Sequence, residues 1–202
     1  MPKSLRPLAA VLPLLLTACA GGPPKSIDNG CAIFDEKDDW YESAHDSYQK
    51  WGVPVHVQLA IIYQESGFQD DAKPPRSKLL WVIPWTRPSS AYGYGQVKDS
   101  TWDWYRDSTG NRWADRDDFE DVTDFIGWYG NITHRKLGVS KWDAYHQYLA
   151  YHEGHGGYQR RSYKKKGWLL KVARKVDNRS KTYQAQLQAC ADDLDEGGWW
   201  PF

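Results

Sequence analysis

Apolar residues recur at helical spacing over most of the chain. Val55, Leu59 and Ile62 follow one another at positions i, i+4 and i+7, so they share one face of a helix. Pro54 suits the start of that helix, and Gly67 is a typical residue at a C-terminal helix end. Comparable patterns predict further helices over residues 38–50, 119–133, 141–154 and 163–191, and a helix capped by Ser100 over residues 100–105. The sequence shows no internal repeat and predicts a mainly α fold.

Residues 70–90 break this helical pattern. The segment holds four prolines, and a helix interior excludes proline because it lacks the amide hydrogen and clashes with the preceding turn. Leu79 to Trp85 is a short apolar run, which we expect to form a strand or one arm of a short hairpin. The glycines of "AYGYGQ" (residues 91–96) indicate a loop whose backbone approaches another part of the molecule closely. We therefore predict a Pro/Trp-rich insert between two helical parts.

The N-terminus has the features of an export signal. Lys3 and Arg6 precede an apolar run, Leu8 to Leu16, which is too short to span a bilayer. Residues 1–18 are therefore predicted to be a signal peptide. "LTAC", which ends at Cys19, resembles a bacterial lipobox, and cleavage before that cysteine would leave it as a lipidated N-terminus. A plain signal peptide followed by an incidental cysteine is the alternative.

The resemblance to a lipobox also has consequences for location. It implies attachment to a membrane through a lipid anchor at Cys19, and Ala20 in the next position implies sorting to the outer membrane of a Gram-negative bacterium. The mature protein is then expected on the periplasmic face of that membrane. Residues 19–30 are interpreted as a tether, residues 31–193 as one domain and residues 194–202 as a C-terminal tail.

Cysteine usage agrees with export. If Cys19 carries lipid, Cys31 and Cys190 are the two cysteines that remain. In an oxidising compartment such a pair commonly forms a disulfide, which here would join the two ends of the domain. Two buried free thiols are the alternative.

Charge and aromatic content narrow the class of partner. The chain has 26 Lys and Arg against 26 Asp and Glu, so it is not drawn to polyanions as a whole, and we predict no nucleic acid partner. Residues 160–181 nevertheless hold ten Lys or Arg and one Asp, which indicates either a solvated helix side or a surface facing anionic envelope polymers. Twelve Trp and thirteen Tyr suit sugar binding, because flat rings stack on sugar CH faces, although an aromatic-rich core would give the same composition.

Three short blocks carry the chemistry of the sequence. Glu65-Ser66 ends the apolar helix, "GYGQ" (residues 93–96) forms the glycine loop, and "AYHEG" (residues 150–154) lies at the predicted end of a later helix. This order resembles the soluble lytic transglycosylase domain, which has a lysozyme-like α fold, over roughly residues 38–160. The resemblance implies peptidoglycan glycan strands as the partner, and no cofactor.

The resemblance also assigns roles to individual positions. Glu65 matches the family's catalytic acid and Ser66 its serine neighbour, while "GYGQ" matches the ends of a Gly-Leu-Met-Gln motif. Tyr151 matches the tyrosine of an Ala-Tyr-Asn motif, whose asparagine is His152 here. On this basis the expected substrate-binding residues are Ser66, Gly93, Tyr94, Gln96, Tyr151, His152 and Glu153.

The link between the first two motifs is usually shorter in this family, so residues 70–90 are expected to be an insert. Trp81 and Trp85 of this insert are expected to form a wall of the glycan cleft, to rest on the membrane, or to be buried in a hairpin.

Elementary chemistry agrees with Glu65 as an acid. Glycosidic cleavage needs a proton on the leaving oxygen, and burial against apolar neighbours raises the pKa of a glutamate, commonly to about 6 in catalytic acids. Ile61, Ile62 and Phe68 are expected to provide this burial, and Tyr151 to orient the carboxyl group. By the resemblance, Glu65 protonates the oxygen between MurNAc and GlcNAc and then deprotonates the sugar's C6 hydroxyl, which closes a 1,6-anhydro ring without a second carboxylate.

Other interpretations stay open. Glu65 alone is also compatible with a charged helix end, although the helix dipole disfavours a carboxylate there. Glu153 as a base that activates water would make the protein a hydrolytic, lysozyme-like muramidase. The altered second and third motifs also fit an inactive peptidoglycan-binding lipoprotein. His152 and His155 are three residues apart, whereas a zinc-binding helix of this kind places its histidines four apart, so no metal site is predicted.

Overall fold

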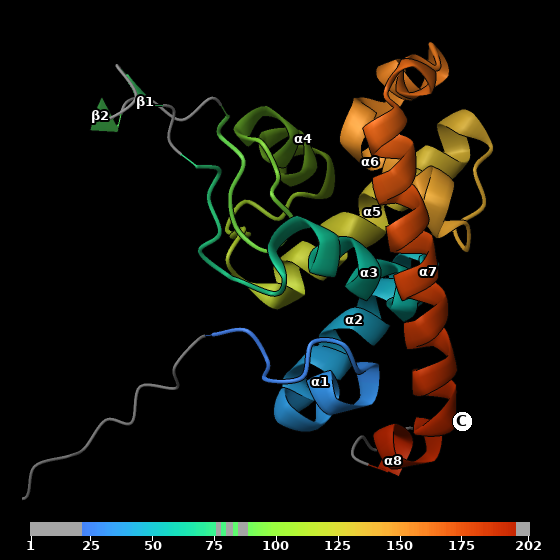
Figure 1. The fold of residues 1–202 in the computed structure, drawn as a ribbon. Helices are drawn as coiled ribbons and strands as arrows, with labels where there is room; N and C mark the ends of the chain where they lie inside the picture. Colours follow the sequence, from blue (N-terminus) through green and yellow to red (C-terminus); the bar gives the residue numbers. More distant parts are fainter. Residues whose placement is uncertain (1–21, 76–77, 80–82, 85–88, 197–202) are drawn as a thin grey trace, which may run out of the picture.

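The computed structural model describes residues 22–75, 78–79, 83–84 and 89–196. Residues 1–18 and Cys19 lie outside the described residues. The described part is mainly helical, as predicted (Figure 1). Its helices are α1 (Gly30–Glu36), α2 (Asp38–Trp51), α3 (Val55–Ser66), α4 (Asp99–Thr109), α5 (Phe119–Leu137), α6 (Ala144–Gln159), the 3-10 helix η1 (Ser162–Lys165), α7 (Gly167–Ala189) and α8 (Ala191–Glu196).

The helices pack around one hydrophobic core. α2 lies against α5, α3 lies against α7, and α6 contacts both α5 and α7. The long α7 runs along one side of the molecule and carries α8 at its C-terminal end (Figure 1). Both α6 and α7 contact α3, the helix that ends at Ser66. None of the described helices combines the length and the apolar character needed to cross a bilayer.

The helix α3 has the limits that the sequence predicts. Pro54 precedes it in an extended conformation, and all residues from His56 to Ile62 are buried, as expected for a helix enclosed by others. Gly67 ends the helix in the left-handed region, with φ 60°, and its amide donates to the Tyr63 carbonyl over 3.1 Å. Glu65 therefore lies in the last turn of a buried helix.

Three predicted helix limits are wrong for local reasons. α4 starts at Asp99 after Lys98, so Ser100 lies inside the helix and does not cap it. α6 does not end at Gly154 but continues to Gln159 across a kink at that residue, which has φ 70° and ψ 158°. The predicted helix over residues 163–191 is divided into η1, α7 and α8, because Lys166 and Cys190 have non-helical backbone angles.

The insert after α3 contains the expected hairpin in a short form. β1 (Lys78–Leu79) pairs antiparallel with β2 (Ile83–Pro84), with Lys78 opposite Pro84 and Leu79 opposite Ile83. Trp81 and Trp85 lie outside the described residues, so their predicted roles stay predictions.

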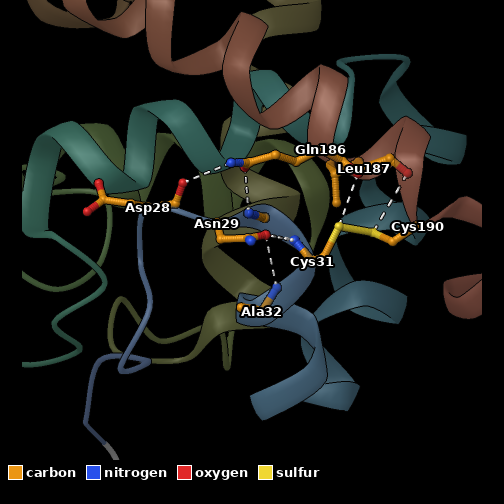
Figure 2. Close-up of a disulfide and its surroundings, with 8 residues drawn as sticks. Asp28, Asn29, Cys31, Ala32, Gln186, Leu187 and Cys190 are labelled. Carbon is orange, nitrogen blue, oxygen red and sulfur yellow. Dashed lines mark hydrogen bonds between the residues drawn. A yellow bond between two sulfur atoms is a disulfide. The ribbon is translucent and has the colours of Figure 1, made fainter.

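The two ends of the domain are joined as the sequence predicts. Cys31 of α1 and Cys190 after α7 form a disulfide that spans 159 positions (Figure 2). Next to it, the Gln186 side chain accepts from the Gly30 amide over 2.9 Å and donates to the Asp28 carbonyl over 3.2 Å. The folded domain therefore begins before residue 31, inside the segment interpreted as a tether, and α8 extends it beyond residue 193.

Candidate active site

Glu65 combines burial with partial access to solvent. It lies on the last turn of α3, surrounded mainly by protein, yet its side chain is not fully covered. Burial raises the pKa of its carboxyl group to about 7, because the ionised form loses hydration. Ile61, Ile62 and Phe68, which were expected to provide apolar surroundings, are all buried in the core. A carboxyl group with this pKa is partly protonated at neutral pH and can donate a proton to a bound molecule.

Tyr148 of α6 is the hydrogen-bonding neighbour of Glu65. Its hydroxyl approaches the carboxyl group closely enough to lower the pKa of Glu65, an effect smaller than the rise caused by burial. Tyr148 itself is buried, which fixes the direction of its hydroxyl. Tyr148 was not predicted from the sequence, although it precedes Tyr151 by three positions and so lies on the same side of the helix.

The expected role of Tyr151 in orienting Glu65 is wrong in its detail. The Tyr151 hydroxyl donates to the Gly95 carbonyl over 2.6 Å and thereby joins α6 to the glycine loop. Tyr151 still lies near the acid. Burial raises the pKa of Tyr151 well above its usual value, and the negative charge of Glu65 is the second contribution to this rise. The structure thus brings the first and third sequence blocks together, and a hydrogen bond ties the second block to the third.

The loop of residues 93–96 needs glycine at positions 93 and 95, because neighbouring atoms leave no room for a side chain there. Gly93 has φ 74°, and a Cβ added there would lie 1.8 Å from the Arg116 carbonyl oxygen. A Cβ on Gly95 would lie 2.8 Å from the Tyr151 hydroxyl oxygen. The loop is therefore held closely between the segment before α5 and the helix α6, which confirms the close backbone approach that the sequence indicated.

The side chains of Gln96 and Tyr94 stabilise the conformation of this loop. Gln96 has a positive φ of 48°, and its side-chain amide donates to the Ala72 carbonyl over 2.8 Å and to the Gly93 carbonyl over 3.0 Å. Tyr94 is buried, and its ring packs edge-on against Trp40 and Phe119. Both side chains thus shape the loop, and their expected contact with substrate stays a prediction.

Ser66 and His152 differ in exposure. The half-buried Ser66 hydroxyl donates weakly to the Ile62 carbonyl one turn earlier, over 3.4 Å. His152 is exposed, and its ring lies 6.4 Å from that of Tyr148 and 5.2 Å from that of Trp168, measured between centroids. Trp168, at the start of α7, is itself 55% exposed. His152 and Trp168 therefore form an exposed aromatic pair beside the buried Tyr148.

Glu153 has no freedom to act as a base. Only 3% of its side chain is exposed, and its carboxylate accepts from Lys166 over 2.7 Å and from the Ser162 hydroxyl. Burial alone would raise the pKa of Glu153, but the hydrogen bonds from Lys166, Ser162 and His152 outweigh it, and the pKa is lowered. The structure assigns this carboxylate to the junction between α6, η1 and α7.

The two histidines that first suggested a metal have different partners. His155 lies stacked on Tyr129 at 4.3 Å, and its Nε2 is 2.9 Å from the Thr133 hydroxyl. Burial lowers the pKa of His155 to about 4, with a smaller contribution from Lys136, so the ring is neutral. His152 instead faces Trp168 and Glu153. Within residues 22–75, 78–79, 83–84 and 89–196, no three His, Cys, Asp or Glu form a group suited to a metal ion.

Fold and site together give a helical domain in which Glu65 is partly protonated at neutral pH. The family model described as Transglycosylase SLT domain matches residues 7–190, nearly the whole chain. The chain belongs to this family, and the lysozyme-like α fold expected from the sequence motifs is confirmed. Membership supports a lytic transglycosylase that acts on peptidoglycan glycan strands. No curated protein and no solved structure matches the chain significantly.

Replacement of Tyr148 by phenylalanine should raise the pKa of Glu65 above its wild-type value. The change removes a hydrogen bond that favours the ionised carboxylate and leaves the burial that opposes it. The measurement is an NMR titration of the Glu65 carboxyl carbon. Tyr151→Phe is the matched control, because the Tyr151 hydroxyl donates to Gly95, and it should leave this pKa close to wild type. An equal shift in both variants, or none in Tyr148→Phe, would contradict the assignment.

Proposed function

We propose that this protein is a peptidoglycan lytic transglycosylase that cleaves the β-1,4 bond between MurNAc and GlcNAc and forms 1,6-anhydro-MurNAc. Glu65 is its single acid and base. The observation that carries the proposal is the pKa of about 7 at a partly accessible glutamate beside Tyr148, in a chain of the transglycosylase family. No cofactor enters the reaction.

The first step uses the protonated form of Glu65. The carboxylic acid donates its proton to the oxygen between the two sugars, and the bond between this oxygen and C1 of MurNAc breaks. The GlcNAc end leaves as an alcohol, and the 2-acetamido group stabilises the positive charge on the MurNAc ring. Glu65 is then ionised, and the Tyr148 hydroxyl favours this form through its hydrogen bond.

The second step returns the proton to Glu65. The carboxylate removes the proton of the MurNAc C6 hydroxyl, and the C6 oxygen forms a bond to C1, which closes the anhydro ring. Because one carboxyl group serves as acid and then as base, no second carboxylate is needed. The loop of residues 93–96, joined to α6 by the Tyr151 hydrogen bond, borders the site, and His152 and Trp168 offer ring faces for neighbouring sugars.

A hydrolytic muramidase is the competing function. It requires a second group that activates water, for which Glu153 was the candidate. The ion pair with Lys166 and the hydrogen bond from Ser162 occupy this carboxylate. This favours the sugar's own C6 hydroxyl over water as the group that bonds to C1 of MurNAc.

The rate of muropeptide release should fall as pH rises through about 7. Glu65 must carry a proton in the first step, and its raised pKa means that the protonated fraction is nearly complete at pH 5 and lost above the pKa. For a pKa near 7 we expect kcat/KM to be about tenfold lower at pH 8 than at pH 6. Unfolding measured over the same pH range is the control, and a rate that is flat from pH 5 to 8 would contradict the role of Glu65.

We propose further that the protein is a lipoprotein of the outer membrane, held at its periplasmic face through Cys19. The motif "LTAC" and Ala20 support this proposal. Cys19→Ala in the full-length chain should move the protein from the membrane fraction into the soluble periplasmic fraction or leave its signal peptide uncleaved. Processing, lipid labelling and membrane association that match wild type would refute the anchor.

A further inference from the structure

A groove lies between α3 and α7, and Gln64, which lines it, directly precedes Glu65 in the sequence. Its volume is about 490 Å³, within the range of about 300–1,000 Å³ that is usual for small-ligand sites. From α3 the groove is lined by Ala60, Tyr63 and Gln64, and from α7 by Lys175, Val176 and Asn178, among others. It therefore combines apolar and polar surface, as a peptide ligand would require.

Three polar side chains of the groove have no bonding partner in the described part of the chain. Gln64 is half-buried, and Lys175 and Asn178 are exposed. Within residues 22–75 and 89–196, none of the three side chains makes a hydrogen bond or an ion pair. An ammonium group and two amides thus remain available to a ligand, and together they suit a carboxylate and the peptide bonds beside it.

The second cation of the groove is already occupied. Arg179 forms an ion pair with Asp28 at 2.8 Å, and its guanidinium stacks on the Tyr63 ring at 4.1 Å from the centroid. Arg179 is therefore held in place at the side of the groove, and Asp28 neutralises its charge. Lys175 is therefore the charge in the groove that a bound anion would neutralise.

The groove is also placed close to Glu65. Gln64 lines it and Glu65 follows directly, so the two side chains leave α3 about 100° apart, one toward the groove and one toward Tyr148. On α7, Trp168, Lys171 and Lys175 are spaced i, i+3 and i+7 and share one face. Trp168 lies against His152, so this face leads from the surroundings of Tyr148 to the groove.

We propose that the groove between α3 and α7 binds the peptide stem that peptidoglycan carries on its MurNAc sugars. A stem carboxylate pairs with Lys175, Gln64 and Asn178 bind the peptide amides, and the half-buried Tyr63 ring borders them. A bare glycan strand carries only the lactyl carboxylate on each MurNAc sugar and no peptide bonds, whereas the stem adds amides and further carboxylates that extend away from the glycan. The inference rests on the proposed function and adds to it a preference for stem-bearing substrate.

The test compares two substrates and two charge reversals. The substrates are glycan strands with intact stems and the same strands after an amidase has removed the stems. Lys175→Glu should lower the ratio of kcat/KM for stem-bearing to stem-free strands about five- to tenfold, since a charged hydrogen bond is lost and a repulsion is introduced. Arg174→Glu makes the same charge change at an exposed neighbour that does not line the groove, and it should leave the ratio as in wild type.

A third variant guards against an indirect effect of charge. Asn178→Ala removes an amide without changing charge and should lower the same ratio several-fold. Wild-type ratios in both Lys175→Glu and Asn178→Ala, or an equal fall in Arg174→Glu, would overturn the groove assignment while leaving the proposed function standing. A wild-type enzyme that releases nothing from either substrate would reject the proposed function, and the inference with it.

Discussion

Replacement of Glu65 by glutamine should lower muropeptide release by about 10³-fold, the typical contribution of a positioned general acid. Glutamine has the same shape and can accept the hydrogen bond from Tyr148, but it has no proton to give to a leaving oxygen. The fold should survive, because an amide in this buried position avoids the cost of an ionised carboxylate. Release of soluble fragments from purified sacculi is the measurement, with thermal unfolding of the same preparation beside it.

Two other glutamates serve as comparisons for this variant. Glu42→Gln changes an exposed residue of α2 and should release fragments at the wild-type rate. Glu153→Gln weakens the ion pair with Lys166, so it should lower stability, and it should retain far more activity per folded molecule than Glu65→Gln. Equal losses in Glu65→Gln and Glu153→Gln would favour the hydrolytic mechanism. Unchanged release in Glu65→Gln would contradict the role of Glu65 as the acid.

Loss of the disulfide is expected to have the largest effect on stability. The double variant Cys31→Ser, Cys190→Ser opens a cross-link across 159 positions, and the chain-entropy model assigns such a closure about 4–5 kcal/mol of unfolding free energy. For a chain of this size the melting temperature should fall by roughly 10 °C or more. Denaturant unfolding of the double variant and of wild type, both without reductant, measures the difference.

Reduction of the wild-type protein provides the control for this prediction. A thiol reductant should lower the stability of wild type to that of the double variant and leave the double variant unchanged. The local contacts of the bridge, such as the hydrogen bond from the Gln186 side chain to the Asp28 carbonyl, remain available in both forms (Figure 2). A double variant that is as stable as oxidised wild type would show that the two ends are held by packing alone.

The sequence predicted those features that depend on local geometry or on residue type alone. The limits of α3 follow from Pro54, Gly67 and an apolar run, all within one segment, and the structure confirms them. The predicted export implied an oxidising compartment and so the pair Cys31–Cys190, which the structure contains. The glycines of residues 93–96 indicated a close backbone approach, and the structure identifies Arg116 and Tyr151 as the groups that come close.

Features that depend on the packing of distant segments were not predicted. Tyr148, and not Tyr151, acts on the Glu65 carboxyl, because the direction of each hydroxyl is set by how α6 lies against α3 and the glycine loop. Glu153 was a candidate base from the sequence. Its ion pair with Lys166 depends on how the segments pack together, so the sequence alone does not show it. Composition likewise showed many tryptophans, but only the fold shows that Trp168 is exposed beside His152.

The mass of the fragments that the wild-type enzyme releases from peptidoglycan tests the proposed reaction most directly. Transfer to the sugar's own C6 hydroxyl predicts fragments that end in 1,6-anhydro-MurNAc, each lighter by one water than its hydrolytic counterpart, and none of them in a digest with Glu65→Gln. Fragments that end only in reducing MurNAc would show that water takes up the sugar and would contradict the proposed reaction.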